Sequence, residues 1–548
     1  MRLPSKTVPF LALLLAPWAC QSPEEAAAEA DRAAYSLVEA RRARLFADET
    51  PFSIEAPEDS LRRRILDGAV EDVGRLSILD CLEIAAENNR EYQSRKESLY
   101  LAALDVTLER WRLGYIADAG AAADLVGVGD EGQSASAGAD ASLSRLLGSG
   151  ARIVAGIGLG MLRLINVGDD WDATSTLSLS VTQPLLSGAG RRIVEEPLTQ
   201  AERDLVYEVR SFERFRRTFA VDVASRVYRL LQQIDAVANE QSNFDNLVLI
   251  RRRNEALAQA GRLSDIQVDQ ASQDELRSSN RLLDQGARLG LQIDELKLFL
   301  GLPIEVELGL DPAELEGLVA QERAALELSE EEAVAFALGH RLDYLTALDQ
   351  VDDSRRRVRV AADALRAGLD LAASASAPSK PGKPARFNAH DASWGVGLDL
   401  ELPVAKLPER NAYRATQIAL EATRRNSEQL SDGIRVDLRE ALRDLEATRE
   451  AYQIQENAVL LAERRVESAR LKMEAGRADT RDILEAQEAL LEAQNAATGA
   501  LIDYTLARLA LYRDMELLRV DASGIAIDAV QLSTPDESED SDGDARKE

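Results

Sequence analysis

The chain has 548 residues, with 95 acidic and 65 basic side chains and a formal net charge of −30. So acidic a chain argues against a general nucleic-acid binder, and only two cysteines argue against a disulfide framework. The charged fraction is 29% and the aromatic fraction 5%, which is typical of long helices and coiled coils. The two histidines lie far apart, and neither a zinc site nor a cofactor is predicted.

The N-terminus predicts an export signal over residues 1–19. Arg2 and Lys6 form a basic start, and Val8–Ala16 is an apolar run too short to span a bilayer as a helix. No later apolar run reaches the length of a membrane helix. The chain is therefore predicted to leave the cytoplasm without a helical membrane anchor.

Cys20 follows the predicted cleavage site and resembles the lipid-accepting cysteine of a bacterial lipoprotein signal. Such signals usually carry leucine and a small residue just before the cysteine, whereas this chain has Pro17 and Trp18. Lipidation of Cys20 is the prediction, and an ordinary secretory signal is the alternative.

Residues 20–75 are predicted to form an N-terminal extension, with a helix over Glu25–Phe46 and then an irregular linker. At the other end, residues 521–548 are rich in acidic residues and poor in apolar ones, which predicts a disordered tail.

Two repeats, at residues 76–327 and 328–520, fill the chain between these ends. Each starts with Leu-Ser and an apolar stripe of helical spacing, in LSILDCLEIAAENN and LSEEEAVAFALGHRLDY. Ser77 and Ser329 are predicted helix caps, and Glu332 completes a capping box with Ser329. The two leading helices are predicted to run about 35 residues, to about Gly114 and Gly368, where the helical pattern ends. Cys81, on the first of the leading helices, is predicted to be buried.

After each leading helix the pattern becomes strand-like. Alternating residues predict strands at Ser134–Leu146, Arg152–Leu164, Thr174–Gln183, Gly368–Ala377 and Ser393–Leu402. A flexible basic loop is predicted between the last two. The alternation fits a membrane barrel and equally a half-buried soluble sheet. Pro184 and Pro403 are predicted to close a strand at the corner before a long helix.

Two long helical hairpins dominate the remaining sequence. Apolar residues recur at 3-4 spacing, as from Leu438 to Met473. About 65 residues of continuous helix would span about 100 Å. Each run ends at an Ala-Gly-Arg turn, with Gly261 and Gly476 ending one helix and Ser264 and Asp479 capping the next.

The order of these features resembles the TolC-type outer-membrane efflux proteins over roughly Arg75–Leu518. The motifs that carry the resemblance are the paired Leu-Ser helix starts, VTQPLLSGAGRR at Val181–Arg192, and the two Ala-Gly-Arg turns. The resemblance implies a mainly α fold with a small β part: a two-repeat, long-helix coiled-coil barrel. Four strands per protomer would then close a trimeric twelve-stranded transmembrane β-barrel.

The resemblance also implies a function. The chain would be the passive exit duct of a tripartite efflux or type I secretion system, a homotrimer in the outer membrane with a periplasmic helical tunnel. Its partners would be a periplasmic adaptor protein, a proton-driven or ATP-driven inner-membrane transporter and outer-membrane lipids, and not nucleic acid.

Two sites follow from the same resemblance. The adaptor-contact candidates are the turn residues Gly261, Arg262, Leu263, Ser264, Gly476, Arg477, Ala478 and Asp479. Their glycines could instead serve the turn alone. Asp482 and Glu485 match an acidic pore gate: they lie three residues apart on one helical face, and in a trimer would form two carboxylate rings that attract cations. An ordinary solvated acidic face is the alternative.

A function of another class remains open, namely a lipid-anchored periplasmic coiled-coil scaffold without a pore. Strands at matching points of a duplication favour the duct. An enzyme is not predicted, because the sequence shows no nucleophile–base set, metal cluster or phosphate-binding loop.

Overall fold

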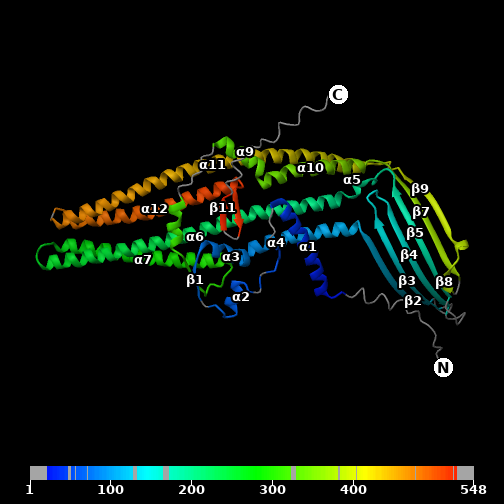
Figure 1. The fold of residues 1–548 in the computed structure, drawn as a ribbon, viewed down its shortest axis with the longest axis horizontal. Coiled ribbons are helices and arrows are strands. Elements are labelled where there is room, and N and C mark those ends of the chain that lie inside the picture. The colour runs from blue at the N-terminus through cyan, green and yellow to red at the C-terminus, as the bar shows by residue number, and fades with distance from the viewer. Residues whose placement is uncertain are drawn as a thin grey trace, which may run out of the picture. The chain divides into compact units, whose positions relative to one another are not determined.

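The computed structural model has its helices and strands arranged as in Figure 1. It describes residues 21–46, 51–55, 57, 59–70, 72–127, 133–164, 172–321, 329–380, 383–402, 404–475, 477–521 and 524–527. The chain forms two compact units. The first draws on Met1–Phe52, Ser98–Val209 and Thr346–Ser427, and the second on Ser53–Glu97, Arg210–Leu345 and Glu428–Glu548. The predicted signal peptide, Cys20 and the chain beyond residue 527 lie outside the described residues.

The two long helical hairpins are confirmed. In the first, α6 (Glu196–Gln259) has 64 residues and is followed by α7 (Asp265–Leu300). In the second, α11 (Leu407–Glu474) has 68 residues and is followed by α12 (Thr480–Asp514). The predicted stripe faces inward, since Leu438, Ala469, Ile483 and Ala486 are all buried. The helices therefore form where apolar side chains recur at coiled-coil spacing.

The leading helix of each repeat is broken, contrary to the prediction of one continuous helix. The first repeat has α3 (Ile78–Asn88) and α4 (Arg90–Arg112), and the second has α9 (Glu330–His340) and α10 (Leu342–Asp363). The breaks are the extended residues Asn89 and Arg341. The Asn89 side chain makes three hydrogen bonds. Its Oδ1 accepts from the Glu91 and Tyr92 amides at 2.8 and 3.0 Å, and its Nδ2 donates to the Phe299 carbonyl at 2.7 Å. This bonding outweighs continuation of the helix.

The predicted caps of these helices are confirmed. Ser77 accepts a hydrogen bond from the Asp80 amide at 3.2 Å. Ser329 and Glu332 form the predicted capping box, with the Ser329 amide donating to Glu332 Oε2 at 3.0 Å. That bond and the Ser329 hydroxyl lower the pKa of Glu332. Both helices thus begin where a capping residue places a side-chain oxygen within hydrogen-bonding distance of a free amide in the first turn.

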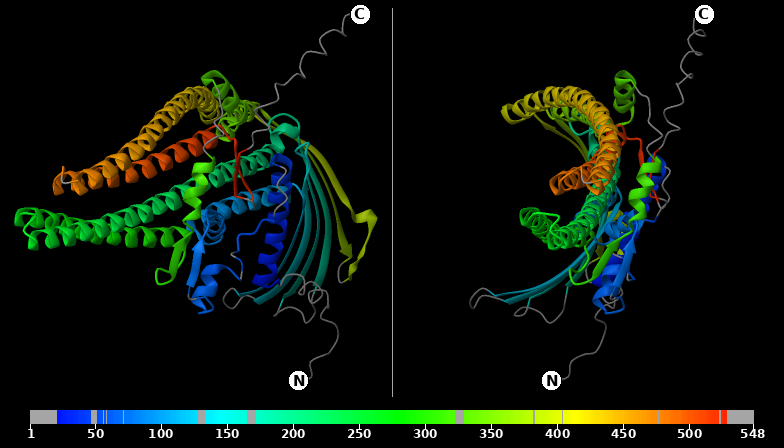
Figure 2. Two further views of the ribbon diagram at one scale, coloured as in Figure 1. Left: turned by 60° about the vertical axis from the view of Figure 1, so that its left-hand side comes forward. Right: turned by 90° about the vertical axis from the view of Figure 1, so that its left-hand side faces the viewer.

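A curved antiparallel sheet lies in the first unit (Figure 2). Its long strands are β2 (Tyr115–Gly127), β3 (Gln133–Leu146), β4 (Arg152–Leu164), β5 (Asp172–Pro184), β7 (Gly368–Lys380) and β9 (Ser393–Glu401), in that order. The short β8 (Lys383–Phe387) and a 3-10 turn (Ala389–Asp391) also form where a flexible loop was predicted.

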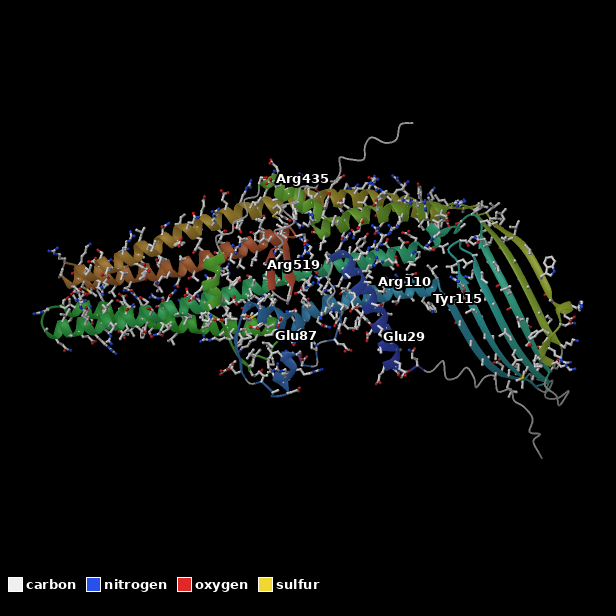
Figure 3. The ribbon with its side chains drawn as sticks, viewed as in Figure 1. Glu29, Glu87, Arg110, Tyr115, Arg435 and Arg519 are labelled. Atoms are coloured by element: carbon white, nitrogen blue, oxygen red, sulfur yellow. The ribbon has the colours of Figure 1, made fainter. Side chains whose placement is uncertain are left out.

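The prediction of four strands per protomer is wrong, because six long strands share this sheet. Among these six long strands, the one without a sequence prediction is β2, which reads YIADAGAAADLVG. Alanine and glycine have little β-propensity, so the segment carries few of the β-branched residues that mark a strand. Figure 3 shows Tyr115 where α4 gives way to β2.

Two further pairs of short strands correct the predicted ends of the repeats. Within the predicted linker, α2 (Leu61–Leu66) is followed by β1 (Asp72–Leu76), which pairs in parallel with β6 (Glu307–Leu310). Near the predicted tail, β10 (Leu518–Asp521) pairs with β11 (Gly524–Ile527). Residues 524–527 are therefore structured, because Leu518 and Ile525 join the apolar core of the second unit. The helix α8 (Ala313–Gln321) follows β6.

The predicted N-terminal helix is confirmed as α1 (Pro23–Phe46). It packs within the first unit: Ala34 and Val38 are fully buried, and the Tyr100 hydroxyl of α4 donates to Asp31 Oδ1 at 2.8 Å. Burial and this hydrogen bond raise the pKa of Tyr100 to about 12. The extension is thus bound to the repeat in this part.

The predicted burial of Cys81 is confirmed, and it has a measurable consequence. The side chain has no exposed surface, and burial raises the pKa of its thiol to about 12. In a Cys20→Ser background we expect no labelling of Cys81 by a maleimide at pH 8, because the reactive thiolate is absent from the folded chain. The same protein in urea should label rapidly. Fast labelling of the folded protein would contradict this burial.

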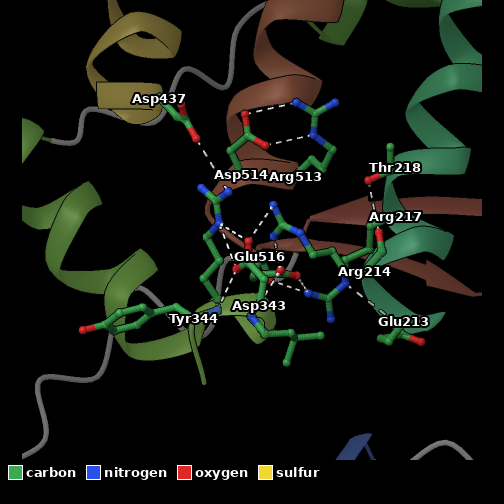
Figure 4. A network of polar contacts seen from close by, with 12 residues as sticks. Glu213, Arg214, Arg217, Thr218, Asp343, Tyr344, Asp437, Arg513, Asp514 and Glu516 are labelled. Carbon is green, nitrogen blue, oxygen red and sulfur yellow. Dashed lines mark hydrogen bonds and ion pairs between the residues drawn. The ribbon is translucent and has the colours of Figure 1, made fainter. Parts of the chain in front are cut away.

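A buried ion-pair network joins four helices of the second unit (Figure 4). Its centre is Glu516, which lies just beyond α12. The Glu516 side chain is 2% exposed. Arg214 Nη1 of α6 approaches Glu516 Oε1 at 2.6 Å, and Arg217 bonds the other oxygen. Arg214 also pairs with Asp343 of α10 at 3.5 Å, and Arg341 reaches Asp437 of α11 at 3.7 Å.

The backbone of Glu516 is in the left-handed region, with φ of 61°, which only glycine adopts without cost. The amides of Glu516 and Leu517 bond back to Arg513 and Tyr512, so this is a helix C-terminal turn where glycine is usual. A glutamate therefore occupies a strained position, and its carboxylate is the group that contacts both arginines.

Candidate functional site

The first hairpin turn closes as predicted around Gly261. Its φ of +68° is left-handed, and the Gly261 and Arg262 amides donate to the Ala258 and Leu257 carbonyls at 2.8 and 2.9 Å. This bonding satisfies carbonyls that the end of α6 would leave free. Ser264 is at the N-cap position of α7, but its side chain makes no capping hydrogen bond, contrary to expectation.

The second hairpin turn repeats this geometry. The Arg477 amide donates to the Lys472 carbonyl at 2.8 Å, matching the bond from Arg262 to Leu257 in the first turn. Gly476 lies outside the described residues. Asp479 is the N-cap of α12, as predicted. The two hairpins end at the same end of the second unit (Figure 1), so the structure brings the two candidate turns together.

Most of the turn surface is open. The exposed predicted contact residues are Gly261, Arg262, Ser264, Arg477 and Asp479. Leu263 and Ala478 are half-buried. Each turn thus has one exposed arginine.

Asp482 serves the start of its own helix. Its Oδ2 accepts a hydrogen bond from the Asp479 amide at 3.0 Å, the arrangement of a capping box. The side chain remains exposed. One carboxylate oxygen is therefore engaged in the protomer.

Glu485 lies one turn further along α12 and has two cationic neighbours. Arg481 Nε donates to its Oε1 at 2.7 Å, and Arg465 Nη2 of α11 lies 3.9 Å from Oε2. The hydrogen bond to Glu485 raises the pKa of Arg481. The Glu485 side chain is still 48% exposed. These ion pairs are therefore hydrated, and separating their charges costs little free energy.

A polar clamp near the turns joins the two hairpins. Asn254 of α6 is 1% exposed, and its Nδ2 donates to Thr480 Oγ1 of α12 at 3.1 Å. Thr480 is itself 2% exposed. Sequence reasoning missed this contact, although Asn254 continues the 3-4 spacing of Leu247 and Ile250. A polar residue on such a stripe is the signal of a register-setting pair.

A second buried contact fixes α7 against α6. Glu240 is 1% exposed; its Oε1 accepts from Ser278 Oγ at 2.5 Å, and Arg281 Nε lies 3.3 Å away. Arg281 Nη1 also lies 4.0 Å from Glu488 of α12. Beside it is a groove of about 300 Å³ that Glu485 helps to line. Its acidic and basic side chains are balanced: Asp274, Glu485 and Glu488 against Arg277, Arg281 and Arg481.

The repeated alanines of the two hairpins share one apolar cluster. Ala271 and Ala486, which correspond in the duplication, are both fully buried there with Leu247, Ile250 and Ile483. Alanine at these positions lets the helices approach closely. The cluster, the clamp and the Glu240 contact therefore hold the hairpin ends as one packed element.

The strand-to-helix corner after β5 uses the VTQPLLSGAGRR motif. Pro184 ends β5 as predicted and pairs with Asp370. The Gly188 amide donates to Asp363 Oδ2 at 2.7 Å, and its φ of +78° is left-handed. A short helix, α5 (Arg191–Val194), precedes α6. Pro403 lies outside the described residues.

The sheet has two faces of opposite character. Directly paired residues of an antiparallel ladder lie on one face, and register places Leu179 with Ala155 and Ala375. The apolar face includes Ile157, Leu177, Val181, Leu371, Val396 and Leu398. The opposite face includes Asp140, Thr176, Ser178, Ser180, Ser374 and Asp399.

The apolar face is open to the surroundings of the single chain. Leu179 is 47% exposed, Val396 65% and Leu398 68%. A soluble sheet would bury such a face, whereas a barrel wall turns it to lipid and its polar face to the lumen. Among the helices that the structure describes, none combines the length and apolar character of a membrane span.

Comparison with known proteins finds solved structures of similar fold. No family model matches the sequence, and no curated protein matches it. The structure of CusC, described as forming a transmembrane channel, has a TM-score of 0.59 at 12% identity, over 85% of this chain and 96% of that one. The CmeC outer-membrane channel of Campylobacter jejuni has a TM-score of 0.57 at 13% identity, over 87% and 91%.

The outer-membrane protein VceC of Vibrio cholerae matches similarly, with a TM-score of 0.57 at 15% identity over 80% of this chain and 95% of that one. The chain has the fold of the TolC-type outer-membrane channels. The predicted mainly α fold with a small β part is thereby confirmed, while the trimeric barrel stays a prediction.

Proposed function

We propose that this chain is the protomer of a homotrimeric outer-membrane exit duct, through which cargo from an inner-membrane transporter leaves passively. The observation that carries the proposal is the two-faced sheet, whose apolar face stays exposed among the residues that the structure describes. The same chain continues from β5 through α5 into a 64-residue helix, as a duct that crosses a wide periplasm requires. The efflux and type I secretion alternatives share this architecture.

The two hairpin turns are proposed to contact a periplasmic adaptor protein. The two turns lie at the same end of the second unit (Figure 1). Each turn has an exposed arginine, Arg262 in the first and Arg477 in the second. The clamp between Asn254 and Thr480 keeps the two turns in register. At Gly261 the absence of a side chain lets a partner approach the backbone closely.

Membrane fractionation and mass measurement in detergent test the proposed function. We expect the exported protein in the outer-membrane fraction, with a detergent-corrected mass of three chains. A soluble monomer would end the duct proposal and leave the coiled-coil scaffold. Lipidation of Cys20 is tested on the same cells by labelling with a fatty-acid analogue, which should mark the wild-type chain and not Cys20→Ser.

Asp482 and Glu485 are proposed to form the acidic gate at the tunnel end. Replacing them with Asn and Gln keeps their shape and the acceptor that caps α12. In planar bilayers we expect the cation-to-anion permeability ratio to fall toward one and block by multivalent cations to weaken, because the carboxylate rings are neutralised.

A matched control for the gate is Glu467→Gln on α11, an exposed carboxylate paired with Arg470 at 3.0 Å. It should leave selectivity and block unchanged. If selectivity is unchanged in the double variant, Asp482 and Glu485 belong to an ordinary solvated surface, where Arg481 and Arg465 neutralise their charge, and they do not form the gate.

A further inference from the structure

We propose that the β2–β3 hairpin is part of the barrel wall, so that three copies of the six long strands close an eighteen-stranded barrel in place of a twelve-stranded one. This inference rests on the proposed function, and it concerns the architecture of the outer-membrane end. The contact surface is the free edge of β2, and its partner is β9 of a second copy of this chain.

The added hairpin is built into the sheet as firmly as the predicted strands. Every residue of β2 from Tyr115 to Gly127 pairs with a residue of β3, in unbroken register. The β3–β4 ladder is likewise continuous from Ser134 to Leu146. A hairpin that merely lay beside the wall would not share this uninterrupted ladder.

The two faces of the sheet also continue across the hairpin. On the apolar face, β2 and β3 place Ala119, Ala121, Leu125, Ala137, Ala139 and Leu143. On the polar face they place Asp118, Asp124, Ser136, Asp140, Ser142 and Ser144. The hairpin therefore has the alternation of a lipid-facing wall, with alanine in the place of larger apolar residues.

The base of the β2–β3 hairpin carries residue types that are usual at a membrane–water interface. Tyr115 and Arg145 pair directly, the Arg145 Nη1 donates to the Tyr115 hydroxyl at 2.6 Å, and the guanidinium lies 4.4 Å from the ring centre. Both lie on the mainly apolar face, beside the end of α4. An aromatic ring with a cation at the end of a strand fits the interface between lipid and water.

Both outer edges of the sheet are free in the described chain. There β2 pairs with β3 alone, and β9 with β7 alone. Neither edge strand contains lysine or proline, the residues that usually protect an edge from pairing. Since strand direction alternates across six strands, β2 and β9 run opposite ways. A second copy can therefore continue the sheet by antiparallel pairing at each edge.

A larger barrel changes the exit. Barrel diameter grows roughly linearly with strand number, so eighteen strands give about 1.5 times the diameter of twelve. The polar face also carries acidic side chains, which are Asp118, Asp124, Asp140, Asp370, Asp399 and Glu401. The proposed exit is thus wide and acidic, suited to bulky neutral or cationic cargo.

Disulfide cross-linking in outer membranes tests the pairing. Leu398→Cys on β9 is combined with cysteine at Ala117, Ala119, Ala121 or Ala123 on β2, in a Cys20→Ser background. These positions share one face, and a scan of alternate residues covers the unknown register. We expect at least one pair to give covalent trimers. The matched comparison combines Leu398→Cys with Ile157→Cys on β4, and should give none.

The outcomes are distinct. Cross-links between β9 and β4 would overturn the proposal, because the wall would then have four strands per copy. Trimers in which no β2 position cross-links would overturn it as well. Fractionation of the same variants before oxidation separates these results from failure of the proposed function, which would appear as soluble monomer. Electron microscopy of the trimer in nanodiscs counts the strands: eighteen supports the proposal and twelve overturns it.

Discussion

Replacing Glu516 with alanine is expected to lower the free energy of unfolding by about 3–5 kcal/mol. The substitution removes the carboxylate that Arg214 and Arg217 contact. Both arginine side chains are mostly buried, with exposed fractions of 23% and 12%. Removing one partner of a buried ion pair leaves an uncompensated charge, which costs more than the pair contributes. Denaturant unfolding of the purified protein, followed by circular dichroism of the helices, measures the change.

Two further variants separate the causes. Glu516→Gly also removes the carboxylate but relieves the left-handed backbone, so it should be about 1 kcal/mol more stable than the alanine variant. Glu488→Ala is the matched control, since its side chain is 62% exposed and its partner Arg281 lies 4.0 Å away. That change should cost at most about 1 kcal/mol. Equal losses for Glu516→Ala and Glu488→Ala would contradict the buried network.

Replacing Leu179 with arginine is expected to destabilise the membrane-inserted protein by about 2–4 kcal/mol per protomer. Leu179 is central in β5, pairs with Ala155 and Ala375, and is 47% exposed on the apolar face. In lipid, an arginine there must hold its charge in hydrocarbon or bend toward the interface. Urea titration of the barrel in phospholipid vesicles measures the loss.

The neighbouring residue gives the control. Ser180 lies on the polar face of the same strand, opposite Val154 and Ser374. Ser180→Arg should change ion selectivity with little change in stability, because its charge would be hydrated in the lumen. If both variants are equally stable in lipid, the apolar face is not the lipid-facing one. If both insert poorly, the sheet is not a barrel wall.

What the sequence determined was chiefly local. The caps at Ser77 and Ser329 and the turn at Gly261 follow from hydrogen bonds within one helical turn, which neighbouring residues specify. The long helices follow from apolar spacing sustained over many turns, as around Leu438. The leading helices show the limit, since Asn89 breaks one of them through a bond to Phe299, far away in sequence.

The state of the candidate gate depended on contacts between helices. Asp482 and Glu485 lie three residues apart on α12, a spacing that fixes a shared face. Their partners were not predictable to the same degree. The Arg465 neighbour comes from α11, and the Asn254–Thr480 clamp joins two hairpins, so both depend on how the helices pack.

Strand number was decided by tertiary structure alone. The alanine-rich β2 has weak strand propensity and no bulky apolar stripe of its own. It becomes a strand because β3 supplies a complete ladder of hydrogen-bonding partners from Gln133 to Arg145. In the same way, Glu516 adopts a conformation that its own residue type disfavours, because two arginines from α6 converge on its carboxylate. In both places, contacts with another element outweigh the local preference of the backbone: the next strand for β2, and the distant α6 for Glu516.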